Sequence, residues 1–384
     1  MRSNYKQLGE FIRQVDVRNT DGKEENLLGV SVQKKFMPSI ANTVGTDFTK
    51  YKVVKKGQFT YIPDTSRRGD KIGIALLEDY DEGLVSNVYT VFEVIDEKKL
   101  IPQYLMLWFS RPEFDRYARF KSHGSVREVM DWDEMCKVEL PVPSYEEQLN
   151  IVESYKAITE RIALKQQIND NLVASLTTVY KELFAEADTK FEKASLQKLC
   201  SKIGSGATPK GGKAAYFDEG VSLIRSTNVF DFRFEYLDLA HINDDQANAL
   251  SNVIVEPNDV LFNITGVSVA RCCMVPNNVL PARVNQHVMI VRPIKGELMS
   301  YYIMFTLCSP YNKAKLLGIG QSGSTREAIN KQELESFEIP VPDDAMLSKF
   351  GGAAKQVYAH ISDNVREIHA LEELKTVLLA ELSR

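Results

Sequence analysis

The glycines at 318, 320 and 323 are the residues whose spacing could hold a cofactor. They satisfy the G-x-G-x-x-G pattern, with which dinucleotide-binding folds bring the backbone close to a pyrophosphate. That fingerprint requires a preceding strand, whereas residues 313–317 (KAKLL) are typical of the end of a helix. We therefore interpret the stretch as a flexible loop, and an enzyme with a cofactor at this loop is the less favoured alternative.

Other catalytic signatures are absent from the sequence. Residues 207–214 (ATPKGGKA) approach a phosphate-binding P-loop but lack its first glycine and the Ser or Thr after its lysine. No G-x-S-x-G, H-E-x-x-H or C-x-x-C pattern occurs, and the five cysteines are an odd number, which favours neither a disulfide framework nor a zinc site. We expect no catalytic residue, no metal site and no cofactor in this chain.

Two stretches have a composition that suits contact with nucleic acid. Residues 50–71 contain seven Lys or Arg residues interleaved with Tyr51, Phe59 and Tyr61, and residues 198–213 contain four lysines and no acidic residue. Lysine and arginine neutralise phosphates and reach base edges. Each stretch taken alone is equally typical of a solvated charged face.

One phrase of the sequence occurs twice. Residues 124–143 read GSVREVMDWDEMCKVELPVP, and residues 323–342 read GSTREAINKQELESFEIPVP, 199 positions later. At the same offset, residues 84–93 and 283–292 both alternate as strands do. The sequence therefore predicts an internally duplicated chain of mixed α/β (α+β) class, with two globular domains alike in frame and different in detail.

A long helix is predicted after each copy of the phrase. In both segments apolar residues recur in alternating steps of four and three, the seam of a coiled coil. Ser144 with Glu147 forms a capping box, and Asp343 is a good N-cap. The predicted organisation is a globular domain at 1–143, a spacer helix at 144–193, a second globular domain at 194–342 and a second helix at 343–384.

Each apolar stripe needs a partner, and the other helix is the nearest one. Because the second domain returns the chain, we expect an antiparallel pair, with Asn169 facing Asn364 as buried asparagines do where they fix register. The residues assigned to helix pairing and subunit docking are Glu147, Gln148, Ile162, Asn169, Leu172, Ile361, Asn364 and Leu371.

This arrangement resembles the specificity subunits of type I restriction–modification systems. The resemblance rests on the phrase G-[ST]-x-R-E followed by [LI]-P-V-P, on Tyr145-Glu-Glu-Gln148 at the start of the first helix, and on Gly206-Ala-Thr-Pro209. It covers essentially the whole chain. The second helix departs from the pattern, because it begins Asp343-Asp-Ala-Met-Leu347 and lacks Glu-Gln.

The resemblance implies that each globular domain is a target-recognition domain reading one half of an asymmetric, bipartite site in double-stranded DNA. The helices would dock two methyltransferase subunits, and restriction subunits would join them. S-adenosylmethionine, ATP and Mg are then expected in those partners, and this chain is expected to be non-catalytic. The DNA-binding candidates are Lys50, Arg67, Arg68, Lys71, Lys210, Lys213, Arg225, Arg271, Gln286 and Gln321.

The sequence also bears on where the protein acts and on one alternative function. The sequence contains no signal peptide and no apolar run long enough for a membrane span, so we expect a cytoplasmic protein with no membrane partner. The alternative to a DNA-specificity subunit is a non-catalytic coiled-coil scaffold that carries two peptide-binding domains.

Overall fold

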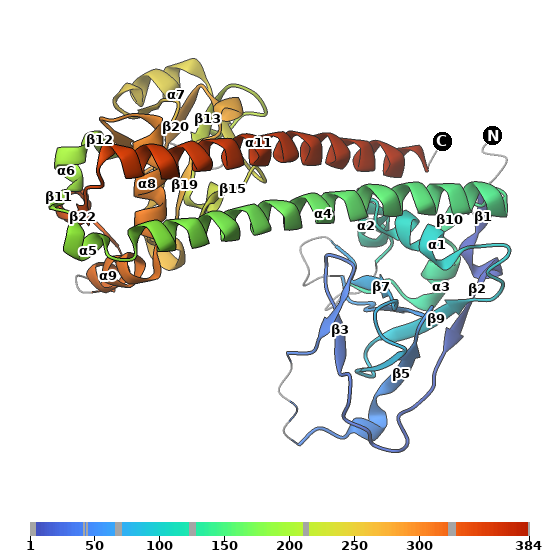
Figure 1. The fold of residues 1–384 in the computed structure, drawn as a ribbon. Coiled ribbons are helices and arrows are strands. Elements are labelled where there is room, and N and C mark those ends of the chain that lie inside the picture. Colours follow the sequence, from blue (N-terminus) through green and yellow to red (C-terminus); the bar gives the residue numbers. More distant parts are fainter. Residues whose placement is uncertain are drawn as a thin grey trace. The chain divides into compact units, whose positions relative to one another are not determined.

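The computed structural model describes residues 5–40, 43, 45–65, 71–122, 128–209, 215–321 and 328–382. The chain divides into two compact units, the first formed by Met1–Leu164 with Ile368–Arg384 and the second by Lys165–Glu367. Each unit contains one globular domain, here called domain 1 and domain 2, together with part of both long helices (Figure 1).

Domain 1 is built on a four-stranded antiparallel sheet with the order β2-β9-β6-β7. Smaller antiparallel pairs are β1–β10, β3–β4 and β5–β8. The strands are β1 (Tyr5–Gln7), β2 (Ile12–Val15), β3 (Leu28–Val30), β4 (Phe36–Pro38), β5 (Lys52–Lys55), β6 (Phe59–Tyr61), β7 (Ile74–Leu76), β8 (Glu82–Val85), β9 (Thr90–Val94) and β10 (Glu139–Pro141). The helices are α1 (Pro102–Phe109), α2 (Pro112–Lys121) and α3 (Trp132–Cys136).

Domain 2 has a four-stranded sheet with the equivalent order β12-β21-β18-β19, and a second sheet with the order β16-β13-β20-β17. Its strands are β11 (Lys193–Ser195), β12 (Cys200–Ser205), β13 (Val221–Ile224), β14 (Val229–Phe230), β15 (Arg233–Phe234), β16 (Ala240–Ile242), β17 (Ile254–Val255), β18 (Val260–Asn263), β19 (Cys272–Met274), β20 (Ala282–Val284), β21 (Val288–Pro293) and β22 (Glu338–Pro340). Its helices are α5 (Ala187–Lys190), α6 (Leu196–Leu199), α7 (Asp244–Ala249), α8 (Glu297–Cys308), α9 (Pro310–Gln321) and α10 (Lys331–Ser336).

The duplication predicted from the sequence is confirmed in the central sheet and in the strand pair that closes each domain. Each domain is closed by a short antiparallel pair of its first and last strands, in which Tyr5 lies opposite Pro141 and Lys193 opposite Pro340. A tyrosine hydroxyl donates to each of these prolines, from Tyr104 at 3.0 Å in domain 1 and from Tyr302 at 2.7 Å in domain 2. Helix α1 of domain 1 and the corresponding helix α8 of domain 2 are thereby fixed to the pair of strands that closes each domain.

One equivalent position on the central sheet has opposite charge in the two domains. In domain 1, Glu93 on β9 accepts from Arg13 and from Gln58. In domain 2, the residue 199 positions after Glu93 is Arg292 on β21, which pairs with the fully buried Asp259 at 2.7 Å. The strand order and the closing strand pair are therefore duplicated, while the polar side chains that pair across the sheet are not.

The two long helices are α4 (Tyr145–Phe184) and α11 (Asp344–Glu381). Both predicted caps are present, since Ser144 and Glu147 bond reciprocally and Asp343 accepts from the backbone N–H of Met346 at 2.8 Å. The first helix ends at Phe184 rather than at 193. Phe184 and Ala187 are buried in the core of domain 2, and the chain must leave the helix there to form α5 and then β11.

The helices pair in antiparallel fashion within each unit, as the sequence predicts. In unit 2, Tyr180 of α4 packs edge-on against Phe350 of α11 with ring centroids 5.4 Å apart, while Asn169, earlier in α4, contacts Asn364, later in α11. In unit 1, Leu382 near the end of α11 is buried in the domain 1 core, against which Ile151 from the start of α4 also packs. Among the described residues, no helix is long and apolar enough to cross a membrane.

Candidate nucleic-acid interface

Sheet topology brings several loops of domain 2 to one edge. Strands β12 and β18 end where β19 and β21 begin, because Ser205 lies opposite Met289, Asn263 opposite Val288, and Phe262 opposite Cys272. Strands β13 and β20 run parallel and end at the same place, since the N–H of Asn285 donates to Ile224 O and the N–H of Gly206 to Asn285 O. We call the segments 206–209, 225–228, 264–271 and 285–287 the edge loops of domain 2.

Three of the sequence-predicted DNA-binding residues lie in these edge loops. The guanidinium of Arg271 lies over the ring of Phe230, 4.7 Å from its centroid. Arg225 lies 5.5 Å from the ring centroid of Tyr216 and donates to the carbonyl of Asp238. Gln286 is exposed, and its side-chain oxygen accepts from the hydroxyl of Thr208. Residues far apart in the sequence therefore present two guanidinium groups and an amide on one edge.

Gln321 is the last residue of α9, and α9 corrects our interpretation of the glycine stretch. Gly318 and Gly320 lie inside this helix, not in a flexible loop, and no strand precedes them. The N–H of Ala328 donates to Gly320 O at 3.1 Å, and Ala328 forms a bridge with Thr265. The end of α9 is thus attached to edge loop 264–271, which brings Gln321 to the same edge.

Four candidates, Arg67, Arg68, Lys210 and Lys213, lie outside the described residues, as do residues 124–127 and 323–327 of the repeated phrase. The two remaining candidates of domain 1 are described. Lys71 is exposed and precedes Ile72, whose N–H donates to the carboxylate of Asp115. Lys50 ends a short 3₁₀ helix (Phe48–Lys50), is largely exposed, and lies 3.4 Å from Asp47.

Domain 1 has an edge built in the same way. A bridge between Asp64 and Val129 corresponds to the bridge between Thr265 and Ala328 in domain 2, and it follows β6 as the other follows β18. Lys71 belongs to the segment that joins β6 to β7, at this edge. Lys50 precedes β5, whose Lys52 lies opposite Val85 at the end of β8.

A buried ion pair near this edge was not foreseen. Lys34 lies in the turn between β3 and β4, with φ of 61°, and its ammonium group lies 2.7 Å from Asp115 on α2. Burial lowers the pKa of Lys34, and the hydrogen bond from Lys34 to Asp115 opposes that shift. The pair fixes the turn on the helix. A lone lysine in a polar stretch gives no signal of such a partner.

The structure assigns Gln148 a different role from subunit docking. Its side chain is fully buried in unit 1. Its oxygen accepts from the N–H of Ile101 at 2.9 Å, and its amide nitrogen donates to the carbonyls of Lys99 and Pro143, each at 2.9 Å. Gln148 therefore attaches α4 to its own domain, and a partner subunit cannot reach it. Glu147 is exposed and occupied by the capping box.

Helix α11 is attached to domain 2 by apolar packing at the position where α4 has Gln148. Leu347, 199 positions after Gln148, is buried in the domain 2 core. Gly351 lies so close to Leu298 that an added Cβ would be 2.7 Å from the Cβ of Leu298. The absence of Glu-Gln at the start of α11 is therefore compensated by close apolar packing.

The seam of the helix pair contains a polar layer at its middle. The amide of Asn364 donates to Asn169 at 2.7 Å, the contact expected from the sequence, and its oxygen accepts from Lys165 at 2.9 Å. Lys165 also pairs with Glu367 at 2.8 Å. Lys165 and Asn364 are 199 positions apart, so equivalent residues of the two copies meet here. Ile162 is buried, and Leu172, Ile361 and Leu371 are half-buried along the same seam.

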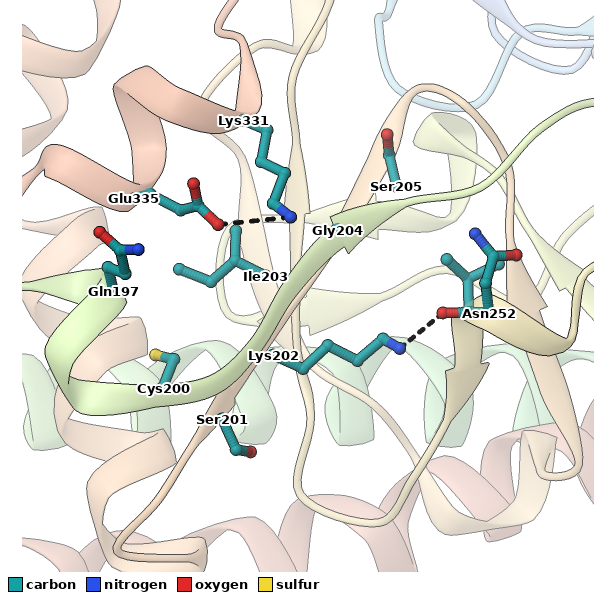
Figure 2. A pocket seen from close by; sticks show the side chains of 11 residues that line it. Gln197, Cys200, Ser201, Lys202, Ile203, Gly204, Ser205, Asn252, Lys331 and Glu335 are labelled. Carbon is teal, nitrogen blue, oxygen red and sulfur yellow. Dashed lines mark hydrogen bonds and ion pairs between the residues drawn. The ribbon is translucent and has the colours of Figure 1, made fainter.

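Domain 2 also has a polar groove of about 520 Å³ along the free edge of β12, between Asn252 and α10 (Figure 2). Lys202 donates to the carbonyl of Asn252 at 2.5 Å, and Lys331 pairs with Glu335 at 3.4 Å. Both lysines of the groove therefore have partners within it. Within the described part of the chain, no cluster of three His, Cys, Asp or Glu residues could hold a metal ion.

The comparisons with known proteins agree with this architecture. The type I restriction modification DNA specificity domain matches the chain twice, at residues 9–174 and 189–376. The type I restriction enzyme MjaIX specificity subunit of Methanocaldococcus jannaschii is 20% identical over an alignment of 310 residues, and the match covers 75% of this chain and 70% of that protein. The type I restriction-modification S subunit of M. genitalium has a similar fold, with a TM-score of 0.58, 12% identity, and coverage of 99% of this chain and 96% of that one. The two matches to the domain family span most of the sequence, and the chain therefore belongs to the DNA specificity subunits of type I restriction–modification systems.

Proposed function

We propose that the edge loops of domain 2, and the corresponding edge of domain 1, read the two halves of a bipartite site in double-stranded DNA. The observation that carries this proposal is the convergence of Arg225, Arg271 and Gln286 on one edge from three separate segments. Arginine can form two hydrogen bonds with guanine and glutamine two with adenine in the major groove. Lys50 and Lys71 would mainly neutralise phosphates in the other half-site.

The two half-sites should differ in sequence. The domains share the order of their central sheet, but the described candidates at the two edges differ, with Lys50 and Lys71 in domain 1 and Arg225, Arg271 and Gln286 in domain 2. Base readout depends on those side chains rather than on the frame. The recognised site is therefore proposed to be asymmetric.

Exposed apolar side chains on the long helices support docking of two methyltransferase subunits there. Leu149 and Leu164 on α4, and Leu374 and Val377 on α11, are between 36% and 56% exposed. Exposed apolar side chains of this kind can be covered by a partner protein where they gather into a patch. Restriction subunits would join this complex through the methyltransferase subunits.

The chemistry is proposed to belong to those partners. S-adenosylmethionine would be bound by the methyltransferase subunits, and ATP and Mg by the partner subunits as well, while this chain selects the site and catalyses no step. The fully paired lysines of the β12 groove support this assignment, because they leave no cation there for a nucleotide.

An Arg271→Ala variant in the complex with the methyltransferase tests the readout. We expect it to lose discrimination at one base pair of the half-site read by domain 2, by about 1–3 kcal/mol, while the other half-site is read as before. Arg116→Ala is the matched control, because Arg116 is an exposed arginine on α2 that pairs with Glu113. Equal loss at both half-sites, or no loss, would contradict the proposed role of the edge loops.

The second candidate function is a scaffold with peptide-binding domains. It is favoured by one feature, the free edge of β12 beside the groove, because an extended peptide can add to such an edge. Retention of DNA binding by a β12 variant that closes the groove, such as Gly204→Val, would argue against this function.

A further inference from the structure

The loop that joins β18 to β19 has a fixed conformation. Three backbone hydrogen bonds cross it, from Val269 N–H to Gly266 O at 2.9 Å, from Ala270 N–H to Asn263 O at 2.8 Å, and from Arg271 N–H to Ser268 O at 3.2 Å. Gly266 and Ala270 both have positive φ, 68° and 64°. The loop therefore turns sharply and is closed by its own backbone.

Its base is held from both sides. The hydroxyl of Thr265 lies 2.7 Å from His287 Nδ1, which belongs to edge loop 285–287. On the other side the N–H of Ile329 donates to Ile264 O at 2.8 Å. Such a loop presents a side chain at its tip in a defined position.

That side chain is Val267, which is 98% exposed, whereas its neighbours Val269 and Ala270 are buried. Single exposed apolar side chains are common on protein surfaces. What distinguishes Val267 is its place on a rigid turn among the edge loops, where a ligand bound at this edge would cover it. Because valine is β-branched, it has few rotamers to lose on contact.

The ligand must offer an apolar group at the edge where Arg225, Arg271 and Gln286 lie. Along the major groove of DNA, the C5 methyl group of thymine is the apolar feature that distinguishes one base pair from the others. We propose that Val267 contacts a thymine methyl in the half-site read by domain 2 and so contributes to its specificity. This inference rests on the proposed DNA readout by the edge loops.

Replacing thymine by deoxyuridine tests the contact, because only the methyl group is removed. Once the target is known, each thymine of that half-site is replaced in turn and binding by the assembled complex is measured. In the wild type, one replacement should weaken binding by about fourfold, the value of one buried methyl group. In Val267→Ser and Val267→Ala, thymine and deoxyuridine at that position should bind equally.

Ile294→Ser is the matched control, since Ile294 is a β-branched residue, 64% exposed, just after the opposite end of β21. It should keep the preference of the wild type for thymine. Specific binding with the same thymine-to-deoxyuridine ratio in wild type and Val267→Ser would overturn the contact alone, as would a half-site with no sensitive thymine. Failure of the wild-type complex to bind any sequence specifically would overturn the proposed function together with this inference.

Discussion

Arg271 and Gln148 show how differently two polar residues can be used in one chain. The Arg271 guanidinium lies over Phe230 at an edge formed by loops, where its donors can reach a ligand. The side-chain oxygen and amide nitrogen of Gln148 both form hydrogen bonds with backbone groups inside unit 1. Residue type alone would suggest a surface role for both, and only burial and hydrogen bonding separate an accessible side chain from one that attaches a helix to its domain.

Replacing Gln148 by alanine should destabilise the protein by about 1–3 kcal/mol, because the N–H of Ile101 and two carbonyls lose their partner in a buried site. Chemical denaturation of the full chain measures this change. Gln166→Ala, at an exposed position of the same helix, is the control and should change stability by less than about 0.5 kcal/mol. Similar effects of the two substitutions would show that the buried network is not needed.

The capping box predicts a dependence of stability on pH. Hydrogen bonds from the Ser144 hydroxyl and N–H lower the pKa of Glu147 below its ordinary value of 4.5. Because the folded-state pKa is the lower one, the stabilisation by Glu147 is present above pH 4.5 and is lost as the pH falls through the lowered pKa. The difference in stability between wild type and Glu147→Ala should therefore shrink on acidification. A difference that stays constant from neutral to acidic pH would be inconsistent with this cap.

At the scale of elements, the long helices could be predicted from the sequence because their signals are local. Steps of four and three specify the seam, and Ser144 and Asp343 specify the starts. The end of α4 at Phe184 could not be predicted, since it depends on burial of Phe184 and Ala187 in a core formed by distant residues. The edge loops of domain 2 could not be predicted either. The strands that position them have two to six residues, and the order in which those strands pair produces no periodic pattern in the sequence.

The polar layer of the helix pair should respond to charge reversal. Lys165 and Glu367 are each about a quarter to a third exposed, so Lys165→Glu should lower stability by about 1–2 kcal/mol, between the values for surface and buried pairs. Glu367→Lys should do the same. The double variant Lys165→Glu with Glu367→Lys should recover most of the loss, measured by chemical denaturation. Additive losses in the double variant would show that the two side chains do not interact in solution.

At the scale of the whole molecule, duplication explains why one chain has two domains with the same strand order and different edges. The central sheet, the closing strand pair and the tyrosine hydrogen bond are common to both copies. The reversed charges of Glu93 and Arg292 show that the copies have diverged even within that frame. On the proposed readout, changing one edge would change one half-site, while the frame and the helices are preserved.

The most direct test of this account is selection from random duplex DNA by the full chain co-purified with its methyltransferase partner. The account predicts enrichment of two different short motifs separated by a gap of fixed length, with Arg271→Ala altering only one of them. Enrichment of a palindrome or of a single uninterrupted motif would contradict the reading by two different edges. An intact complex that enriches no sequence would contradict DNA recognition by these domains altogether.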